Sequence, residues 1–276
     1  MQTDAISSYV PLSSTCSTTG TYGSVVTGIS GSTVTVSQRA TSTVTDQPMT
    51  TSSGFGGFSF QNVQSLNMCD NSFSNTTGSG ASPGAIEIVG DSSTPYIVGA
   101  GPAKIVNATL VGGGISIDTT SNVSISGVQI QLAYPLFPNV TGAININSSN
   151  HITLSGSTVD MTGVGPTGHA GVYDICNHAG DSCSNLQVSN LTILDDGQST
   201  EAAYHIGFSQ GSDMGAISIM GGQVHGFTHP GAAAYFLNHA VTDITIEGVD
   251  DSGNAELFNP AGQTPGPGNP QLTYTP

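Results

Sequence analysis

The chain has 276 residues, of which only two, Arg39 and Lys104, are Lys or Arg, while 18 are Asp or Glu. The formal net charge is therefore −16. Nucleic acids and anionic membrane surfaces are bound through clustered Lys and Arg, so this composition argues against both partners. No apolar run approaches the ~20 residues of a membrane-spanning helix, so we expect no membrane insertion.

Residues 1–57 are rich in Ser, Thr and Gly and follow no regular pattern over most of their length. Two short runs of Val, Ile and Thr, at 25–29 and 33–36, flank Ser30-Gly31-Ser32 and predict a β-hairpin. Because solenoids need a cover at each open end, we expect 1–57 to be an N-terminal β cap or an attachment region.

From about residue 58 to 250 the sequence repeats one strand–corner–strand pattern. The clearest copies are 123–127, 152–156, 186–190, 217–221 and 244–248. In each, two apolar residues alternate with small or polar ones, and Gly or Asn follows. These Gly and Asn positions lie 29, 34, 31 and 27 residues apart. A repeat period of this length indicates a solenoid, and the alternation places the apolar side chains on one face of the strand.

A further short strand precedes each copy. We predict these strands at 115–117, 144–146, 173–175, 205–208 and 235–237, with their apolar members, such as Tyr173 and Ile175, on the same face. Gly and Asn tolerate the left-handed backbone of a sharp corner. One coil cannot bury its inner face alone, but stacked coils form a continuous core. The sequence therefore predicts an all-β chain that is a parallel β-helix over 58–250.

The repeat ends after Asp250. Three residues past the corner, the earlier copies carry Ile130, Val159, Ile193 and Val224, whereas the last copy carries Asp251. Residues 259–276 contain five prolines and no regular pattern. We therefore expect 251–276 to be an extended, Pro-rich C-terminal tail.

The four cysteines suggest two disulfides. Cys176 and Cys183 bracket a six-residue insertion between two predicted strands, so a disulfide between them is plausible, and Cys16–Cys69 would be the remaining pair. Four reduced thiols are the alternative. The short spacings of a zinc site are missing, so we favour both interpretations over a metal site.

Stacking places the long loops of successive coils, at 131–143, 160–171, 194–204 and 225–234, side by side along the solenoid. The residues there that we expect to bind a glycan are Tyr134, Phe137, His169, His225, Phe227 and His229. Carboxylates hydrogen-bond sugar hydroxyls and aromatic rings pack on sugar C–H faces, so this mixture favours a neutral glycan.

Four carboxylates in the same loops are candidate catalytic residues: Asp195, Asp196, Asp160 and Glu201. Glycoside hydrolysis needs two carboxyls, about 5–5.5 Å apart for retention or about 6.5–9.5 Å apart for inversion, which neighbouring loops could supply. An Asp-Asp-Gly run is also an ordinary turn signal, and we favour that interpretation.

Histidines gather in the same half of the chain. His225 and His229, with His169 or His205 from preceding coils, could form a metal site. Because His225 and His229 lie in a loop rich in Gly and Pro, we favour a solvated or stacked row, and we expect no metal and no other cofactor.

On the opposite side of the solenoid, Asn122, Asn185 and Asp243 stand just before the second strand of their coils. We expect their side chains to form a polar ladder there.

The repeated coils of 58–250 resemble right-handed parallel β-helix proteins of the pectate-lyase-like group. That group includes polysaccharide lyases, polygalacturonases and the trimeric tailspikes and spike proteins of viruses. The resemblance implies a right-handed, single-stranded parallel β-helix. The basic catalytic residues of the lyases have no match here, and of the polygalacturonase motifs only Asp195-Asp196 is present. The chain is closest in character to the viral spikes.

We therefore expect a virion spike or host-recognition protein that is exposed on the virion surface and extracellular. We expect it to be a homotrimer that binds a neutral cell-surface carbohydrate. Its N-terminal region would join other virion proteins. The N-terminus lacks the basic and apolar regions of a secretory signal, which fits a protein that is assembled in the cytoplasm and exposed after release. An extracellular glycoside hydrolase and a ligand-free structural surface protein are the alternatives.

Overall fold

The computed structural model describes the strands at 26–30, 33–36, 58–61, 66–69, 72–73 and 84–89, and then residues 103–132, 141–166, 168–177, 183–208 and 214–276. Every regular element in these ranges is a β-strand, as the scarcity of helix formers in the composition predicts. Within the same ranges, no helix of the length and apolarity needed to cross a membrane is found.

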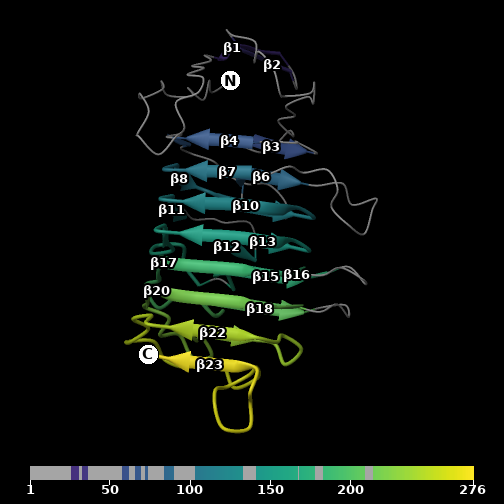
Figure 1. Cartoon of the computed structure of the whole chain (residues 1–276). Coiled ribbons are helices and arrows are strands. Elements are labelled where there is room, and N and C mark those ends of the chain that lie inside the picture. The colour runs from purple at the N-terminus through teal and green to yellow at the C-terminus, as the bar shows by residue number, and fades with distance from the viewer. Residues whose placement is uncertain are drawn as a thin grey trace.

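The chain winds so that successive turns add strands to two parallel sheets (Figure 1). The seven-stranded sheet contains β3 (Phe58–Gln61), β6 (Gly84–Val89), β9 (Gly114–Asp118), β12 (Gly142–Asn147), β15 (Ala170–Cys176), β18 (Tyr204–Phe208) and β21 (Tyr235–Leu237). Each of these strands pairs in parallel with the equivalent strand of the next turn. The prediction of a parallel β-solenoid is therefore confirmed.

The twelve-stranded sheet contains the other two strands of each turn. Its main row is β4 (Leu66–Cys69), β7 (Ala103–Val106), β10 (Ser121–Ser126), β13 (Asn150–Ser155), β17 (Leu186–Leu194), β20 (Ile217–His225), β22 (Ile244–Glu247) and β23 (Leu272–Thr275). Its second row is β5 (Ser72–Phe73), β8 (Thr109–Gly112), β11 (Gln129–Leu132) and β14 (Thr158–Asp160), which then pairs with the second half of β17. In β17 and β20 the second and third strands of a turn have thus become one.

Two smaller pairings complete the described strands. β16 (Cys183–Ser184) and β19 (Met214–Gly215) pair in parallel. β1 (Val26–Ser30) and β2 (Thr33–Val36) pair antiparallel, with Ser30 opposite Thr33. The predicted N-terminal hairpin is therefore confirmed, whereas its role as a cap or an attachment region stays a prediction.

The corners between the second and third strands have the backbone that the Gly and Asn pattern predicts. Positive φ angles occur at Asn107, Gly127, Gly156, Asn190, Gly221 and Gly248. A second row of positive φ angles, between 54° and 63°, precedes the second strand at Asn122, His151, Asn185, Ala216 and Asp243. Asn and Asp tolerate this left-handed backbone better than other side chains do, so backbone geometry gives a reason for the row that we expected to be a polar ladder.

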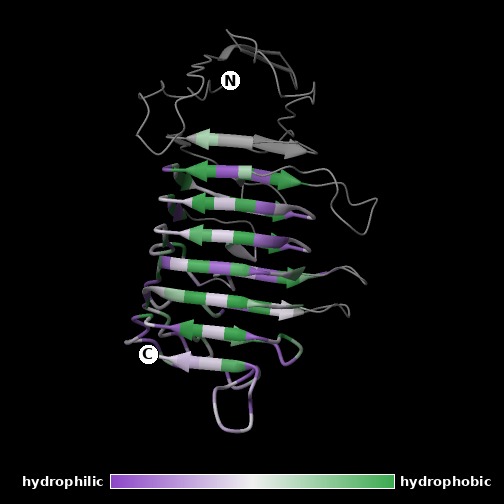
Figure 2. Ribbon diagram, viewed as in Figure 1, coloured by the Kyte–Doolittle hydropathy of each residue, from purple (hydrophilic) through white to green (hydrophobic). Residues whose placement is uncertain are grey.

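The core is a continuous column of apolar side chains inside the solenoid. In the twelve-stranded sheet one inner row is Val123, Ile152, Leu186, Ile217, Ile244 and Leu272, all buried. Figure 2 shows the alternation of apolar and polar residues along the strands of the stack. Adjacent coils are bonded edge to edge, so each coil completes the core of its neighbours.

The inner face of β15 differs from the expected one by a single residue. Val172 pairs with Ile144, and Asp174 pairs with Ile146, so Asp174 points inward while Tyr173 and Ile175 point outward. In β18 the inner residue is likewise Tyr204, and His205 lies outside. The expectation that Tyr173 and Ile175 lie on the inner face is wrong, because the pairing register with β12 outweighs the local apolar pattern.

The last 26 residues add to the stack rather than leaving it. β23 pairs in parallel with β22, and Phe258 forms a bridge with Tyr235. Leu272 is buried, and the side chains of Phe258 and Tyr274 pack against the core. The part of 251–276 that we expected to be an extended tail therefore carries one further rung of the twelve-stranded sheet.

Candidate functional site

The acidic residues of the long loops are held by backbone N–H groups. Asp195, which is 9% exposed, accepts hydrogen bonds from the N–H groups of Gly197 (2.9 Å) and Ser199 (3.1 Å). Burial raises the pKa of the Asp195 carboxyl, against the opposing effect of these two donors. Asp196 accepts from the N–H of Gly163 on the preceding coil (3.0 Å). These contacts fix the turns and tie two loops together.

The other two candidate carboxylates also have local partners. Asp160 Oδ1 accepts from the N–H (2.9 Å) and the hydroxyl (2.6 Å) of Thr162. Glu201 Oε1 lies 3.0 Å from His205 Nδ1 and accepts from the N–H of Ala202 (3.1 Å). Turn formation accounts for Asp160 and Asp195, and a link between two loops accounts for Asp196. The catalytic role stays a prediction.

The residues expected to bind a glycan are not brought together by the described part of the loops. Phe227 (0% exposed) and His169 (4% exposed) are buried, so neither presents a surface to solvent. His225 donates from Nδ1 to the carbonyl oxygen of Ser252 (2.8 Å), and its Nε2 lies 3.3 Å from Asp250 Oδ2. His229 is exposed. Tyr134 and Phe137 lie outside the described residues.

No metal site is formed by the residues that the structure describes, since no three His, Cys, Asp or Glu side chains there are grouped to hold an ion. His225 is instead engaged by Asp250 and Ser252, and His205 by Glu201. The row of histidines is therefore divided between the loops and the outer face of the seven-stranded sheet.

A row of aromatic side chains crosses the outer face of the seven-stranded sheet. It is formed by Tyr173, His205 and Phe236, which are paired residues of β15, β18 and β21. The ring centroids are 4.6 Å apart between Tyr173 and His205 and 4.5 Å apart between His205 and Phe236, with interplanar angles of 34° and 36°. All three side chains are half-buried, so one edge of the row is open to solvent. We call these three residues the aromatic row.

Polar groups border the aromatic row. Glu201 contacts His205. Burial, and to a smaller extent the charge of Glu201, raises the pKa of the Tyr173 hydroxyl. Burial acts to raise the pKa of Glu201 itself, but His205 and the Ala202 N–H outweigh it and hold that pKa below its ordinary value. On the other side, Asn145 pairs with Tyr173 in the sheet. The row thus offers rings, a carboxylate and an amide on one surface.

Sequence reasoning missed this row because it depends on register. Read in order, Tyr173 and Tyr235 look like equivalent inner residues, but the structure pairs Tyr173 with His205 and His205 with Phe236. The signal that would have found it is the alternation Val172-Tyr173-Asp174 matched to Ile144-Asn145-Ile146, which puts the aromatic residue and Asn145 on the same face.

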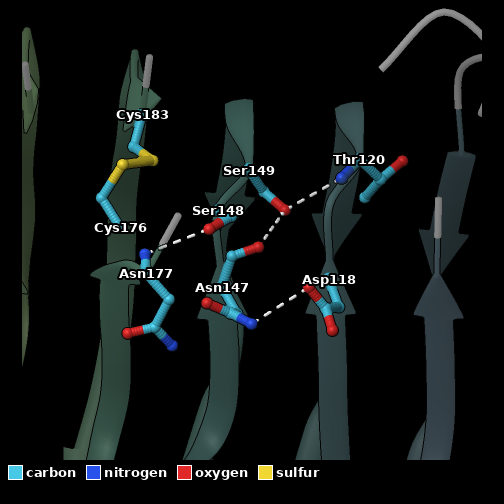
Figure 3. The surroundings of a disulfide bond; sticks show 8 residues. All are labelled: Asp118, Thr120, Asn147, Ser148, Ser149, Cys176, Asn177 and Cys183. Carbon is cyan, nitrogen blue, oxygen red and sulfur yellow. Dashed lines mark hydrogen bonds between the residues drawn. A yellow bond between two sulfur atoms is a disulfide. The ribbon is translucent and has the colours of Figure 1, made fainter. Parts of the chain in front are cut away.

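The turns that follow β9, β12 and β15 are joined to one another by polar side chains (Figure 3). Ser149 Oγ accepts from the N–H of Thr120 (3.1 Å), and Asn147 Nδ2 donates to Asp118 Oδ1 (3.0 Å). One coil further, Cys176 and Cys183 form a disulfide that closes the insertion between β15 and β16. Cys16 and the Cys69 side chain lie outside what the structure describes.

Comparison of the chain with protein-family models, with curated proteins and with solved structures gives no match. The function therefore has to be argued from the geometry of this chain.

Proposed function

We propose that this protein is a surface-recognition β-solenoid whose aromatic row binds a neutral glycan. The observation that supports this is the continuous outward row Tyr173–His205–Phe236 beside Glu201. Aromatic side chains on a rigid sheet have few free torsions. They therefore lose little conformational entropy when they bind a ligand.

The chemistry of the row favours a sugar among possible ligands. The rings supply apolar edges and faces for the C–H groups of a sugar, while Glu201 and Asn145 supply hydrogen-bonding groups for hydroxyls. The chain carries a net charge of −16 and two Lys or Arg residues, so an anionic glycan would meet repulsion without a compensating cation. A neutral glycan is the class that avoids this cost.

We propose a host-recognition spike on the virion surface as the biological setting, with the chain as a homotrimer in the extracellular medium. The support for this setting is the resemblance of the repeated coils to viral spikes. Light scattering of the purified protein tests the assembly, and a trimer is the expected result. A monomer that binds no glycan would favour a structural surface protein.

The site is tested by single substitutions in the aromatic row. After a glycan array has identified a neutral ligand, calorimetry should show that Tyr173→Ala and Phe236→Ala each weaken binding about tenfold, the effect of losing about 1.4 kcal/mol of ring contact. Met220→Ala is the matched control, because Met220 is a large apolar side chain that the twelve-stranded sheet exposes to solvent (38% exposed). Its affinity should equal that of the unmodified protein.

The same experiment separates the aromatic row from the long loops. If His229→Ala abolishes binding while Tyr173→Ala and Phe236→Ala leave it intact, the glycan binds to the loops and the proposed site is wrong. Circular dichroism of each variant should retain the β spectrum of the unmodified protein, which shows that a loss of affinity is not a loss of fold.

A further inference from the structure

A carboxylic acid interrupts an aliphatic row inside the solenoid. The paired inner residues of β9, β12, β15, β18 and β21 are Ile117, Ile146, Asp174, Ile206 and Leu237. All four neighbours in this row are fully buried, and Asp174 is 4% exposed. A polar side chain thus occupies an inner position at which β9, β12, β18 and β21 each carry an aliphatic residue.

The surroundings of Asp174 do not solvate a charge. Its Oδ1 atom is buried without a hydrogen-bond partner. The crevice that it borders is also lined by Ser149, Ile152, Cys183, Ser184, Leu186, Gly215 and Ile217, and it has no room for a water molecule. Figure 3 shows two of these residues, Cys183 in the disulfide and Ser149 on the neighbouring coil. A buried charge without a partner or water is costly, so the neutral form of the acid is favoured.

No opposite charge compensates from the packed elements. β12 and β18 present Ile146 and Ile206, and the crevice residues of the twelve-stranded sheet and of β16 and β19 do not titrate, since Cys183 is in a disulfide. Tyr204 also points inward from β18, and burial raises its pKa, so it is neutral. On β15 itself, Tyr173 points to the opposite face and Cys176 is oxidised.

We propose that Asp174 is a proton-dependent lock on the coil formed by β15, β16 and β17: the core accepts the side chain as a neutral carboxylic acid, and its ionisation loosens that coil. The protein is thereby most stable in an acidic medium. The inference does not rest on glycan binding, because its readout is stability.

The direction of the pH dependence follows from the two protonation states. Burial raises the pKa of Asp174 to about 8 in the folded chain, whereas an unfolded Asp has a pKa of about 3.9. Below pH ~4 both states hold the proton and the penalty is absent. Between pH ~4 and ~8 only the folded state holds it, so the folding equilibrium constant falls up to tenfold for each pH unit. Above pH ~8 both states are ionised and the penalty is constant.

Denaturant unfolding from pH 4 to 9 tests the proposal. Asp174→Asn has nearly the same shape as the neutral acid and cannot ionise, so its stability profile should lack the tenfold-per-unit fall that the unmodified protein shows. Asp243→Asn is the matched control, because Asp243 is exposed and Asn suits its left-handed backbone. That variant should keep the fall. Parallel profiles for Asp174→Asn and the unmodified protein would overturn the proposal.

A second measurement covers the case in which Asp174→Asn does not fold. Asp174→Leu continues the aliphatic row and also lacks an ionisable group. The infrared spectrum of the unmodified protein at pH 6.5, minus that of the Leu variant, should contain the C=O band of a protonated carboxyl, and this band should vanish above pH 9. If the difference spectrum at pH 6.5 contains only a carboxylate band, Asp174 is ionised in the fold and the proposed lock does not exist.

Discussion

At the scale of single residues, Asp251 shows how an exception to the repeat is accommodated. Gln223 and Asp250 form a bridge, so Asp251 follows Val224 in the row of inner residues. There its carboxylate accepts hydrogen bonds from the hydroxyls of Tyr235 (3.1 Å) and Tyr274 (3.1 and 3.2 Å). The position is not a failure of the pattern but the acceptor for two tyrosines of the C-terminal end.

Removing this acceptor should destabilise the fold. Asp251→Ala leaves two hydroxyls without a partner, and hydrogen bonds to a charged group contribute about 1.5–3 kcal/mol each, so we expect a loss of about 2–3 kcal/mol after solvent exposure is allowed for. Tyr274→Phe removes one donor and should cost about 1 kcal/mol. Urea unfolding measures both, and Glu256→Ala, at an exposed site in the same segment, should change stability by less than about 0.5 kcal/mol.

The stability of this end of the molecule should also depend on the ionisation of Tyr274 at alkaline pH. Burial and then the charge of Asp251 raise the pKa of Tyr274 to about 12, above the value of about 10 in an unfolded chain. Its contribution is therefore complete below pH ~10 and is lost as the pH rises from about 10 to 12. An Asp251→Ala variant whose alkaline transition is unchanged would show that the carboxylate does not hold the hydroxyls.

The position of a residue could be predicted from the sequence where one physical factor determines it. Where two factors compete, the position could not be predicted. Gly127, Gly156 and Asn190 mark corners because few other residues adopt a positive φ angle. Asp174 is different. Its polarity predicts an outer position, and only the pairing of β15 with Ile144 and Ile146 places it inside. Register is a property of two strands, so one strand read alone does not contain it.

At the scale of elements, close contact between coils depends on glycines whose Cβ position is occupied. Gly226 has a φ of 90°, and a Cβ atom there would overlap the carbonyl oxygen of Asp195 on the preceding coil. Gly231 has the same φ of 90°, but a Cβ atom there would have no neighbour within 4 Å. The two positions therefore separate backbone strain from contact between coils.

The pair makes a matched comparison. Gly231→Ala should cost about 1–2 kcal/mol, since only the strained backbone opposes it. Gly226→Ala should cost about 3 kcal/mol or more, because the chain at residue 226 must also move away from Asp195. Thermal unfolding of the two variants gives the difference. Equal losses would mean that the loops of neighbouring coils separate easily, and a groove made of those loops would then not be rigid.

At the scale of the whole molecule, the period of the corners was sufficient to predict the fold. A period near 30 residues with alternating apolar residues has few solutions other than stacked coils. The candidate site was harder to predict, because the aromatic row combines one residue from each of three coils. Neither Tyr173 nor Phe236 carries a local signal, and the row exists only through the registers of β15, β18 and β21.

The same stacking explains why the chain needs its last residues. A solenoid that ends at β22 would expose the edges of both sheets and the inner ring of Tyr235. Instead, Thr275 accepts from the N–H of Gly248 (2.8 Å), Leu257 from that of Tyr235 (3.0 Å), and Phe258 stacks on Tyr235 with ring centroids 5.2 Å apart. Gln263 Nε2 also donates to the carbonyl oxygens of Asn238 and Val241 (2.6 Å each).

Truncation after Asp250 should therefore do more than shorten the molecule. Loss of these contacts removes the last paired rung, so we expect a marked fall in the unfolding midpoint, or association through the exposed edge of β22, both detectable by urea unfolding combined with light scattering. Removal of Pro276 alone deletes none of the contacts named above and should leave both measurements unchanged. A truncated protein that is monomeric and as stable as the full chain would mean that residues 251–276 do not contribute to the stability of the fold. The stabilising end of the solenoid would then lie at β22, with its edge hydrogen bonds satisfied by water.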